Sequence, residues 1–181
     1  MTRLFPVLLL TALNASTAPV DLAPLDPEKH KAALLVFITH DCPVANRYAP
    51  EIARITKQFA KQVKTTLVYV DPDMTEREMA THRKDYGYAQ IPVVHDRKHA
   101  LVHASGARVT PEAVIVLPGG KVAYRGRISD FYTGFGVARR VVTQHDLRDA
   151  LAAVISGQRA RPPRGKTIGC FIPKLANKKQ P

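Results

Sequence analysis

Apolar and polar positions along the chain follow two periods, which predict strands and helices in turn. Residues 33–39 (ALLVFIT) are a continuous apolar run, and residues 65–71 (TTLVYVD) are rich in β-branched side chains, so both are expected to be strands. Between them, residues 44–62 carry apolar side chains three or four positions apart, the spacing of an amphipathic helix: Ala49, Ile52, Ile55 and Phe59.

The second half of the chain continues the alternation. Thr75 and Glu78 stand at the spacing of a capping box and predict a helix through about Tyr86. A short extended segment (IPVVHD), a helix at about 97–104 capped by Asp96, a hairpin (EAVIVL and KVAYRG around Pro118-Gly119-Gly120) and a last helix at about 145–156 are expected to follow. Strands alternating with helices predict an α/β fold with a mixed sheet.

The two ends of the chain differ in character from this domain, for which we expect the bounds 19–157. Residues 1–18 combine Arg3, an apolar run too short for an ordinary membrane span, and small residues suited to cleavage. They predict a signal peptide and a periplasmic or secreted protein; an uncleaved anchor is the alternative. Residues 158–181 have little to bury and are predicted to be an extended tail.

Basic residues give the 181-residue chain a net charge of +12, and its tail contributes strongly. Seven positive charges follow Gly157 with no acid among them: Arg159, Arg161, Arg164, Lys166, Lys174, Lys178 and Lys179. Such a tail favours solubility and can attract an anionic membrane surface. Export argues against nucleic acid as a partner.

One of the two cysteines stands where a predicted strand turns into a helix. Cys42 follows the first strand and precedes Pro43, which suits the first helical position. Unpaired N–H groups and the positive end of the helix dipole stabilise a thiolate at that place. Because only the thiolate attacks, the position predicts a nucleophile, although a buried structural cysteine is the alternative.

The strand-THDCP-helix segment, followed by VTPEAVIVLPGGKVAYRG, resembles the thioredoxin-like superfamily. The resemblance covers about residues 31–156 and is greatest to the redoxin branch, which includes alkyl hydroperoxide reductase and thiol-specific antioxidant relatives as well as exported thiol–disulfide proteins. It implies a three-layer sandwich with a central mixed sheet flanked by helices. It also implies that Cys42 is the reactive thiol and that Pro111, after Thr110, is a cis-proline facing that thiol.

Several positions depart from the patterns of that superfamily. Ala45 replaces the second cysteine of a CxxC motif, so Cys42 has no resolving partner in its own helix. Thr39 stands three residues before Cys42, as in the peroxidase branch, but Leu35 replaces the proline expected four residues earlier. Peroxidases also need an arginine beside the thiol. Arg125 and Arg127 are candidates, and His40 is a further candidate for tuning the thiolate.

Cys170 lies in a short apolar stretch (GKTIGCFIP, residues 165–173) within the basic tail, and this stretch predicts a docked segment. Three interpretations remain open: Cys170 resolves Cys42 in a redox couple, the pair forms a permanent bridge, or both thiols bind a soft metal. Adding His40 would give a ligand set suited to copper(I) or zinc. His95, His99 and His103 recur every fourth residue, which is typical of a solvated helix face or, alternatively, of a metal site.

The residues together predict an exported thiol–disulfide oxidoreductase that acts on a redox partner protein or a peroxide. Cys42 attacks, Cys170 resolves, Pro111 faces the substrate, and Thr39, His40 and Arg127 tune the thiolate. No cofactor is expected, with copper at Cys42, Cys170 and His40 as the alternative. The non-enzymatic rival is a binding module whose working surface is the Arg/Gly loop at residues 125–136.

Overall fold

A mixed five-stranded sheet forms the centre of the computed structural model, which describes residues 30–175. The strands are ordered β3-β2-β1-β5-β6. Their bounds are Val93–His95 for β3, Val63–Tyr69 for β2, Ala32–Ile38 for β1, Glu112–Val116 for β5 and Val122–Gly126 for β6. β1 pairs in parallel with β2 and antiparallel with β5, so the carboxyl end of β1 lies beside the start of β5.

The central strand β1 is buried on both faces, which explains its unbroken apolar run. Leu34, Val36 and Ile38 join the larger apolar cluster, whereas Leu35 and Phe37 join a second cluster on the opposite face. Since successive side chains of a strand point to opposite faces, seven consecutive apolar residues serve two cores at once.

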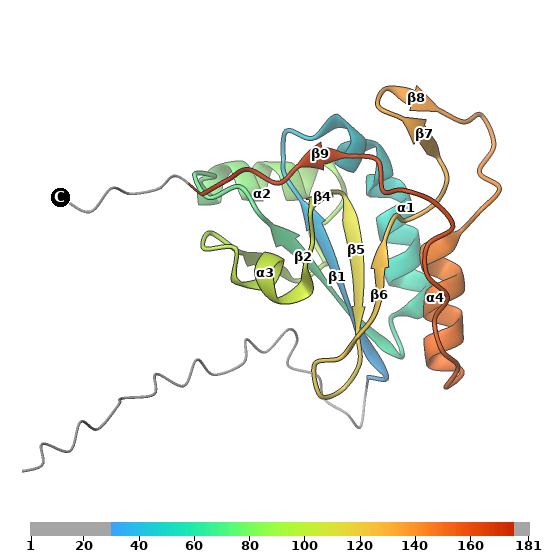
Figure 1. Ribbon diagram of the computed structural model, residues 1–181. Helices are drawn as coiled ribbons and strands as arrows, with labels where there is room; N and C mark the ends of the chain where they lie inside the picture. The colour runs from blue at the N-terminus through green and yellow to red at the C-terminus, as the bar shows by residue number, and fades with distance from the viewer. Residues whose placement is uncertain (1–29, 176–181) are drawn as a thin grey trace, which may run out of the picture.

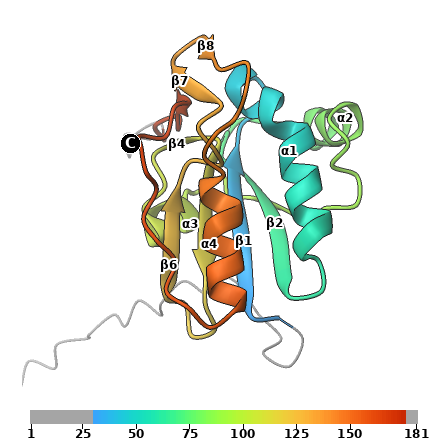
Figure 2. The ribbon, with the colours of Figure 1, turned by 90° about the vertical axis from the view of Figure 1, so that its right-hand side faces the viewer.

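Helices cover both faces of the sheet (Figures 1 and 2). α1 (Pro43–Phe59) and α4 (Asp146–Ile155) pack on the larger cluster, and α3 (Ala100–Ser105) packs on the second. α2 (Glu76–Asp85) lies beside α1 and opens with the predicted capping box at Thr75. The predicted three-layer α/β sandwich is therefore confirmed.

The periodicity of the sequence does not predict two small sheets. β7 (Tyr132–Gly134) lies within the expected Arg/Gly loop at residues 125–136 and forms a hairpin with β8 (Val137–Ala138), which directly follows that loop. β4 (Val109–Thr110) pairs antiparallel with β9 (Cys170–Phe171) in the tail. Strands of two or three residues are too short to show a period. In addition, the β4 residue Thr110 and its β9 partner Cys170 are 60 positions apart in the chain.

The tail is not free coil between Gln158 and Ile172, and we call this segment the strap. Figures 1 and 2 show it leaving the end of α4, running along β6 and reaching the end of the molecule where α1 begins. Ala160 is buried, and Pro163 packs against Gly126 so closely that a methyl group there would clash. The expectation that the tail has little to bury is thus wrong for the strap, because its small and apolar residues fit against β6.

No helix within residues 30–175 is long and apolar enough to cross a membrane. The predicted signal peptide, residues 1–18, lies outside the described residues.

Candidate active site

Cys42 is the N-cap of α1 and is almost fully buried, with 2% of its surface exposed. The loop after β1 ends at this residue, and Pro43 begins the helix, as expected from the sequence. The backbone N–H of Ala45 donates to the Cys42 sulfur at 3.5 Å. The sulfur therefore lies at the positive end of the α1 dipole, a place that stabilises a thiolate.

The Thr110–Pro111 peptide bond is cis, as the resemblance implies, and it lies against the thiol. The Cys42 thiol donates to the Thr110 carbonyl at 3.1 Å. Thr39 does not contact Cys42 directly among the described hydrogen bonds; its hydroxyl lies 3.5 Å from the Thr110 hydroxyl. Thr39 thus helps to hold the residue whose carbonyl meets the thiol.

Cys170 reaches the same place from the strap. The β4–β9 register pairs Thr110 with Cys170 and Val109 with Phe171, and the Ile172 N–H donates to the Arg108 carbonyl at 3.3 Å. Burial, followed by a hydrogen bond to Cys42 and by the charge of Cys42, raises the pKa of the Cys170 thiol, while the Val44 N–H partly opposes that rise. Cys170 therefore lies opposite the residue whose carbonyl meets the Cys42 thiol.

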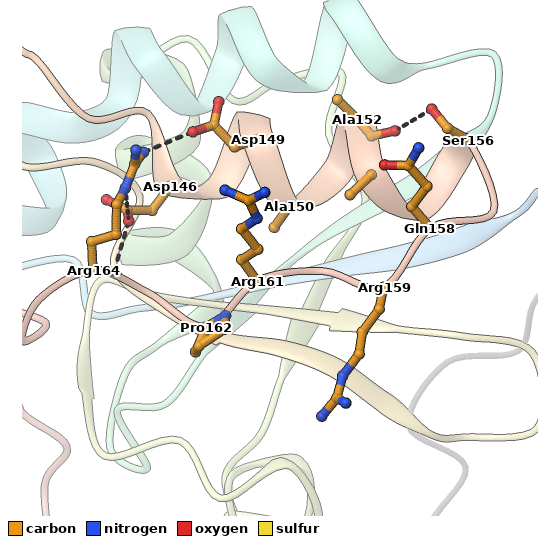
Figure 3. Close-up of a pocket in the computed structure, with 11 residues that line it drawn as sticks. Asp146, Asp149, Ala150, Ala152, Ser156, Gln158, Arg159, Arg161, Pro162 and Arg164 are labelled. Carbon is orange, nitrogen blue, oxygen red and sulfur yellow. Dashed lines mark hydrogen bonds and ion pairs between the residues drawn. The ribbon is translucent and has the colours of Figure 1, made fainter.

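The middle of the strap is held by ion pairs of Arg164 (Figure 3). Arg164 donates through its backbone N–H and its Nε to Asp146 Oδ1, at 2.9 and 3.2 Å, and its Nη2 lies 2.7 Å from Asp149 Oδ2. Although burial raises the pKa of Asp146, these bonds and those from Arg127 lower it overall. A pocket of about 450 Å³ opens here between α4 and the first half of the strap, and neither cysteine lines it.

Arg127, a candidate for tuning the thiolate, is engaged away from Cys42. Its Nε lies 2.8 Å from Asp146 Oδ2, its Nη2 donates to Gln144, and its side chain packs against Gly165 of the strap. Arg125 donates to the Ser105 carbonyl. Within residues 30–175 the hydrogen bonds and ion pairs of these two arginines go to other residues and none goes to Cys42.

His40 turns toward α2 rather than toward the sulfur. Its Nδ1 lies 3.5 Å from Asp71 Oδ2, and its carbonyl accepts a hydrogen bond from Asn46 Nδ2 at 2.8 Å. Asn46 Oδ1 in turn lies 2.9 Å from His82 Nε2, and His82 Nδ1 lies 2.8 Å from the Tyr69 hydroxyl. Burial lowers the pKa of His82 to about 4, so a neutral ring accepts from Tyr69 and donates to Asn46. This chain of bonds fixes the loop that carries Cys42.

The three regularly spaced histidines do not form a site. His99 is the N-cap of α3 in a left-handed conformation, is buried, and bonds the Val70 carbonyl at 2.7 Å, so the solvated face expected from its spacing is wrong for this residue. His95 bonds the Asp71 carbonyl, and His103 is exposed. Among the described residues no group of three or more His, Cys, Asp or Glu side chains is placed to hold a metal ion.

Comparison with known proteins identifies the class of this chain. A family model described as thioredoxin-like matches residues 30–122. The chain belongs to the thioredoxin-like family, which confirms the predicted redoxin-type superfamily. No curated protein matches the chain.

Solved structures share the fold over most of the chain. A protein from Geobacillus kaustophilus described as uncharacterized and conserved is 24% identical, with 82% of this chain and 79% of that chain covered and a TM-score of 0.68. A hypothetical protein from Sinorhizobium meliloti 1021 is 25% identical over 82% of each chain, also with a TM-score of 0.68. A secreted disulfide oxidoreductase of Mycobacterium tuberculosis is 14% identical, over 72% of this chain and 85% of that one, with a TM-score of 0.50.

Sequence reasoning did not identify several residues that build this site. Asn46 and His82 hold the loop before Cys42, Asp146 holds the strap, and Gly169 touches the backbone of Thr110. Only the glycine carried a signal, because a glycine directly before a cysteine in a docked segment suggests a close approach of two backbones.

Proposed function

We propose that the protein is an exported thiol–disulfide oxidoreductase whose redox couple is Cys42 and Cys170. The observation that supports this most is the position of Cys170 opposite Thr110 in the β4–β9 ladder, because the Thr110 carbonyl accepts the hydrogen bond from the Cys42 thiol at 3.1 Å. The thioredoxin-like fold supports the same class of chemistry. The proposed compartment rests on the apolar pattern of residues 1–18.

The reaction proceeds as two thiol–disulfide exchanges. The Cys42 thiolate attacks one sulfur of a substrate disulfide, forms a mixed disulfide and releases the other substrate sulfur as a thiolate, which takes up a proton. Cys170 then loses its proton and attacks the Cys42 sulfur, which releases the remaining substrate thiol. Two electrons pass from the two cysteines to the substrate, and the protein is left with a Cys42–Cys170 disulfide. In the opposite direction the same steps oxidise a dithiol.

The groups around the two sulfur atoms give Cys42 and Cys170 different roles in this reaction. The α1 N-terminus stabilises negative charge on Cys42, which makes it the attacking group. The raised pKa of Cys170 keeps it protonated until the mixed disulfide forms, so the resolving step follows the attack. Thr39 and the cis-Pro111 bond position the Thr110 carbonyl, and His40 positions the loop through Asn46. A redox partner protein with an accessible disulfide or dithiol is the proposed substrate.

The experiment is a reduction potential for the mature wild-type protein, measured in glutathione buffers with non-reducing peptide mapping. A Cys42–Cys170 disulfide with a potential above about −300 mV supports a redox couple. A potential far below that value would indicate a permanent structural disulfide that fixes the strap. Two thiols that never form a bond with each other would contradict the proposal. Loading with copper(I) or zinc and desalting tests the metal alternative in parallel.

A further inference from the structure

The β7–β8 hairpin carries large apolar side chains that the fold leaves in water. Gly134 of β7 pairs with Val137 of β8, so Phe135 lies in the turn at the tip of the hairpin. The exposed fractions are 71% for Phe135, 58% for Val137 and 70% for Val141, which follows β8 closely. These side chains add nothing to either apolar cluster of the core.

The hairpin projects from the end of the molecule where α1 begins and where β9 lies, as Figures 1 and 2 both show. β9 adds Phe171, whose side chain is 87% exposed. Phe171, the hairpin and Val141 thus account for the four largest exposed fractions among the large apolar side chains of residues 30–175. Apolar side chains that gather in this way mark a surface that contacts a protein or a membrane, whereas singly scattered ones do not.

The hairpin segment is also basic. Residues 131–143 contain Arg139 and Arg140 and no acid. Arg139 lies 3.3 Å from Asp130 Oδ2, so its charge is partly neutralised. Arg140 is exposed and has no ion pair among the described residues. At least one guanidinium group beside the apolar tip therefore remains available to an anion.

The strap adds further positive charge near β9. Lys174 is exposed three positions after Phe171, and the tail contains no acid. An exposed acid, Asp41, precedes α1 and offsets part of this charge. The hairpin itself carries no such acid, so an anionic surface would attract the tip most strongly.

A projecting tip of this composition suits a lipid surface better than a folded partner. A stable protein interface buries about 800 Å² on each partner, and a narrow turn offers little of that area. Lipid headgroups, in contrast, admit a single aromatic or aliphatic side chain and present phosphate groups to arginine. Aromatic side chains are also enriched at the boundary between membrane and water.

We propose that the β7–β8 hairpin is a peripheral membrane-binding element for bilayers that contain anionic phospholipid. Phe135 and Val137 enter the headgroup region, and Arg140 binds lipid phosphate. A molecule bound in this way presents the end that carries Cys42 to the membrane surface (Figures 1 and 2). The contact requires no thiol chemistry, so it stands or falls independently of the proposed function.

The first test is co-sedimentation of the mature protein with vesicles of phosphatidylcholine and phosphatidylglycerol in equal amounts. Phe135→Ser is expected to lower the partition coefficient roughly tenfold. Arg140→Gln should lower it roughly fivefold, and should leave binding to vesicles of phosphatidylcholine alone unchanged. The matched controls, Val94→Ser on β3 and Arg161→Gln on the strap, remove exposed side chains elsewhere and should leave the coefficient unchanged.

Equal partition coefficients for the wild type and Phe135→Ser, with unaltered circular dichroism spectra, overturn the proposal and assign vesicle binding to the basic tail. A wild type that does not bind the vesicles also overturns it. If that wild type self-associates and Phe135→Ser does not, the hairpin is instead a contact between copies of the chain.

The second test places a reporter at the tip. The chain contains no tryptophan, so Phe135→Trp supplies a single fluorophore and keeps a large aromatic side chain there. With the mixed vesicles its emission should shift to shorter wavelength, and brominated lipid should quench it. Val94→Trp, at a position 41% exposed on β3, should show neither change. An unshifted and unquenched Phe135→Trp signal from vesicle-bound protein overturns insertion of the tip.

Discussion

The regions that carry Cys42 and Cys170 bring two sulfur atoms together but are held by different interactions. Cys42 sits on the helix that follows β1, the strand buried on both faces, and a chain of bonds from Asn46 to Tyr69 holds its loop. Cys170 sits on a strap fixed by a short ladder with β4, close backbone contact at Gly169 and the ion pairs of Arg164.

This difference implies that the strap can move without disturbing the rest of the fold. Segments held by few buried apolar contacts open at a lower free-energy cost than the core, so the strap can move while α1 remains fixed. The proposed function needs a fixed attacking thiol and a movable resolving thiol, because in that reaction the substrate must displace Cys170 from Cys42 before Cys170 displaces the substrate.

The largest effect is expected from replacing each of the two cysteines in turn. Cys42→Ser should lower disulfide-exchange turnover by about a thousandfold or more, because the thiol proposed to attack the substrate is lost. Cys170→Ser should keep the first exchange and accumulate a mixed disulfide with substrate. Turnover assays and non-reducing gels measure both. Equal turnover in the two variants and in the wild type would favour a binding module instead.

Apolar truncation should distinguish the scaffold from the strap. Ile52, 1% exposed on α1, contributes to the main cluster, and Ile52→Ala is expected to lower the free energy of unfolding by about 2–4 kcal/mol. Phe171→Ala on the strap should change it by less than about 0.5 kcal/mol. Urea unfolding followed by circular dichroism gives both values, and similar losses would show that the strap belongs to the cooperative core.

Acid should weaken the scaffold through His82. Its pKa is about 4 in the folded chain, where burial and the charge of His40 lower it, against an ordinary value of 6.5. The unfolded chain therefore binds more protons between these values, so stability is complete above about pH 6.5 and is lost as the pH falls toward 4. After allowance for solvent screening we expect about 1–2 kcal/mol.

Urea unfolding at pH 7 and pH 4.5 measures this loss. The difference between the free energies of unfolding at the two pH values should shrink in His82→Gln. It should persist in His103→Gln, a change at an exposed histidine. A difference of the same size in both variants would assign the acid sensitivity to other groups.

The smallest effect is expected at Arg164, in the middle of the strap. Arg164→Ala removes the ion pairs with Asp146 and Asp149 and should raise the alkylation rate of Cys42, in the Cys170→Ser background, only a few-fold. The control is Arg161→Ala, an exposed neighbour with no ion pair among the described residues. A fall in the rate, or an equal rise in both variants, would show that these ion pairs do not hold the strap.

Local patterns were sufficient to predict the scaffold and the position of Cys42 at the start of α1. The apolar run at β1, the spacing of Ile52 and Ile55 in α1, and the position of Cys42 before Pro43 each depend on residues a few positions apart. Periodicity and capping report such short-range relations directly. The family resemblance added the cis bond before Pro111, which no local rule would have required.

Tertiary structure decided which distant residues meet. The sequence left Cys170 open to three interpretations and offered Arg127 as a partner for the thiol, whereas the fold pairs Thr110 with Cys170 and binds Arg127 to Asp146. These contacts join residues 60 and 19 positions apart. Their formation depends on the packing of β6, α4 and the strap against one another, and that packing leaves no period in the sequence. The sequence by itself thus determined that Cys42 stands at the start of a helix, and only the folded chain determined that Cys170 lies opposite Thr110 beside it.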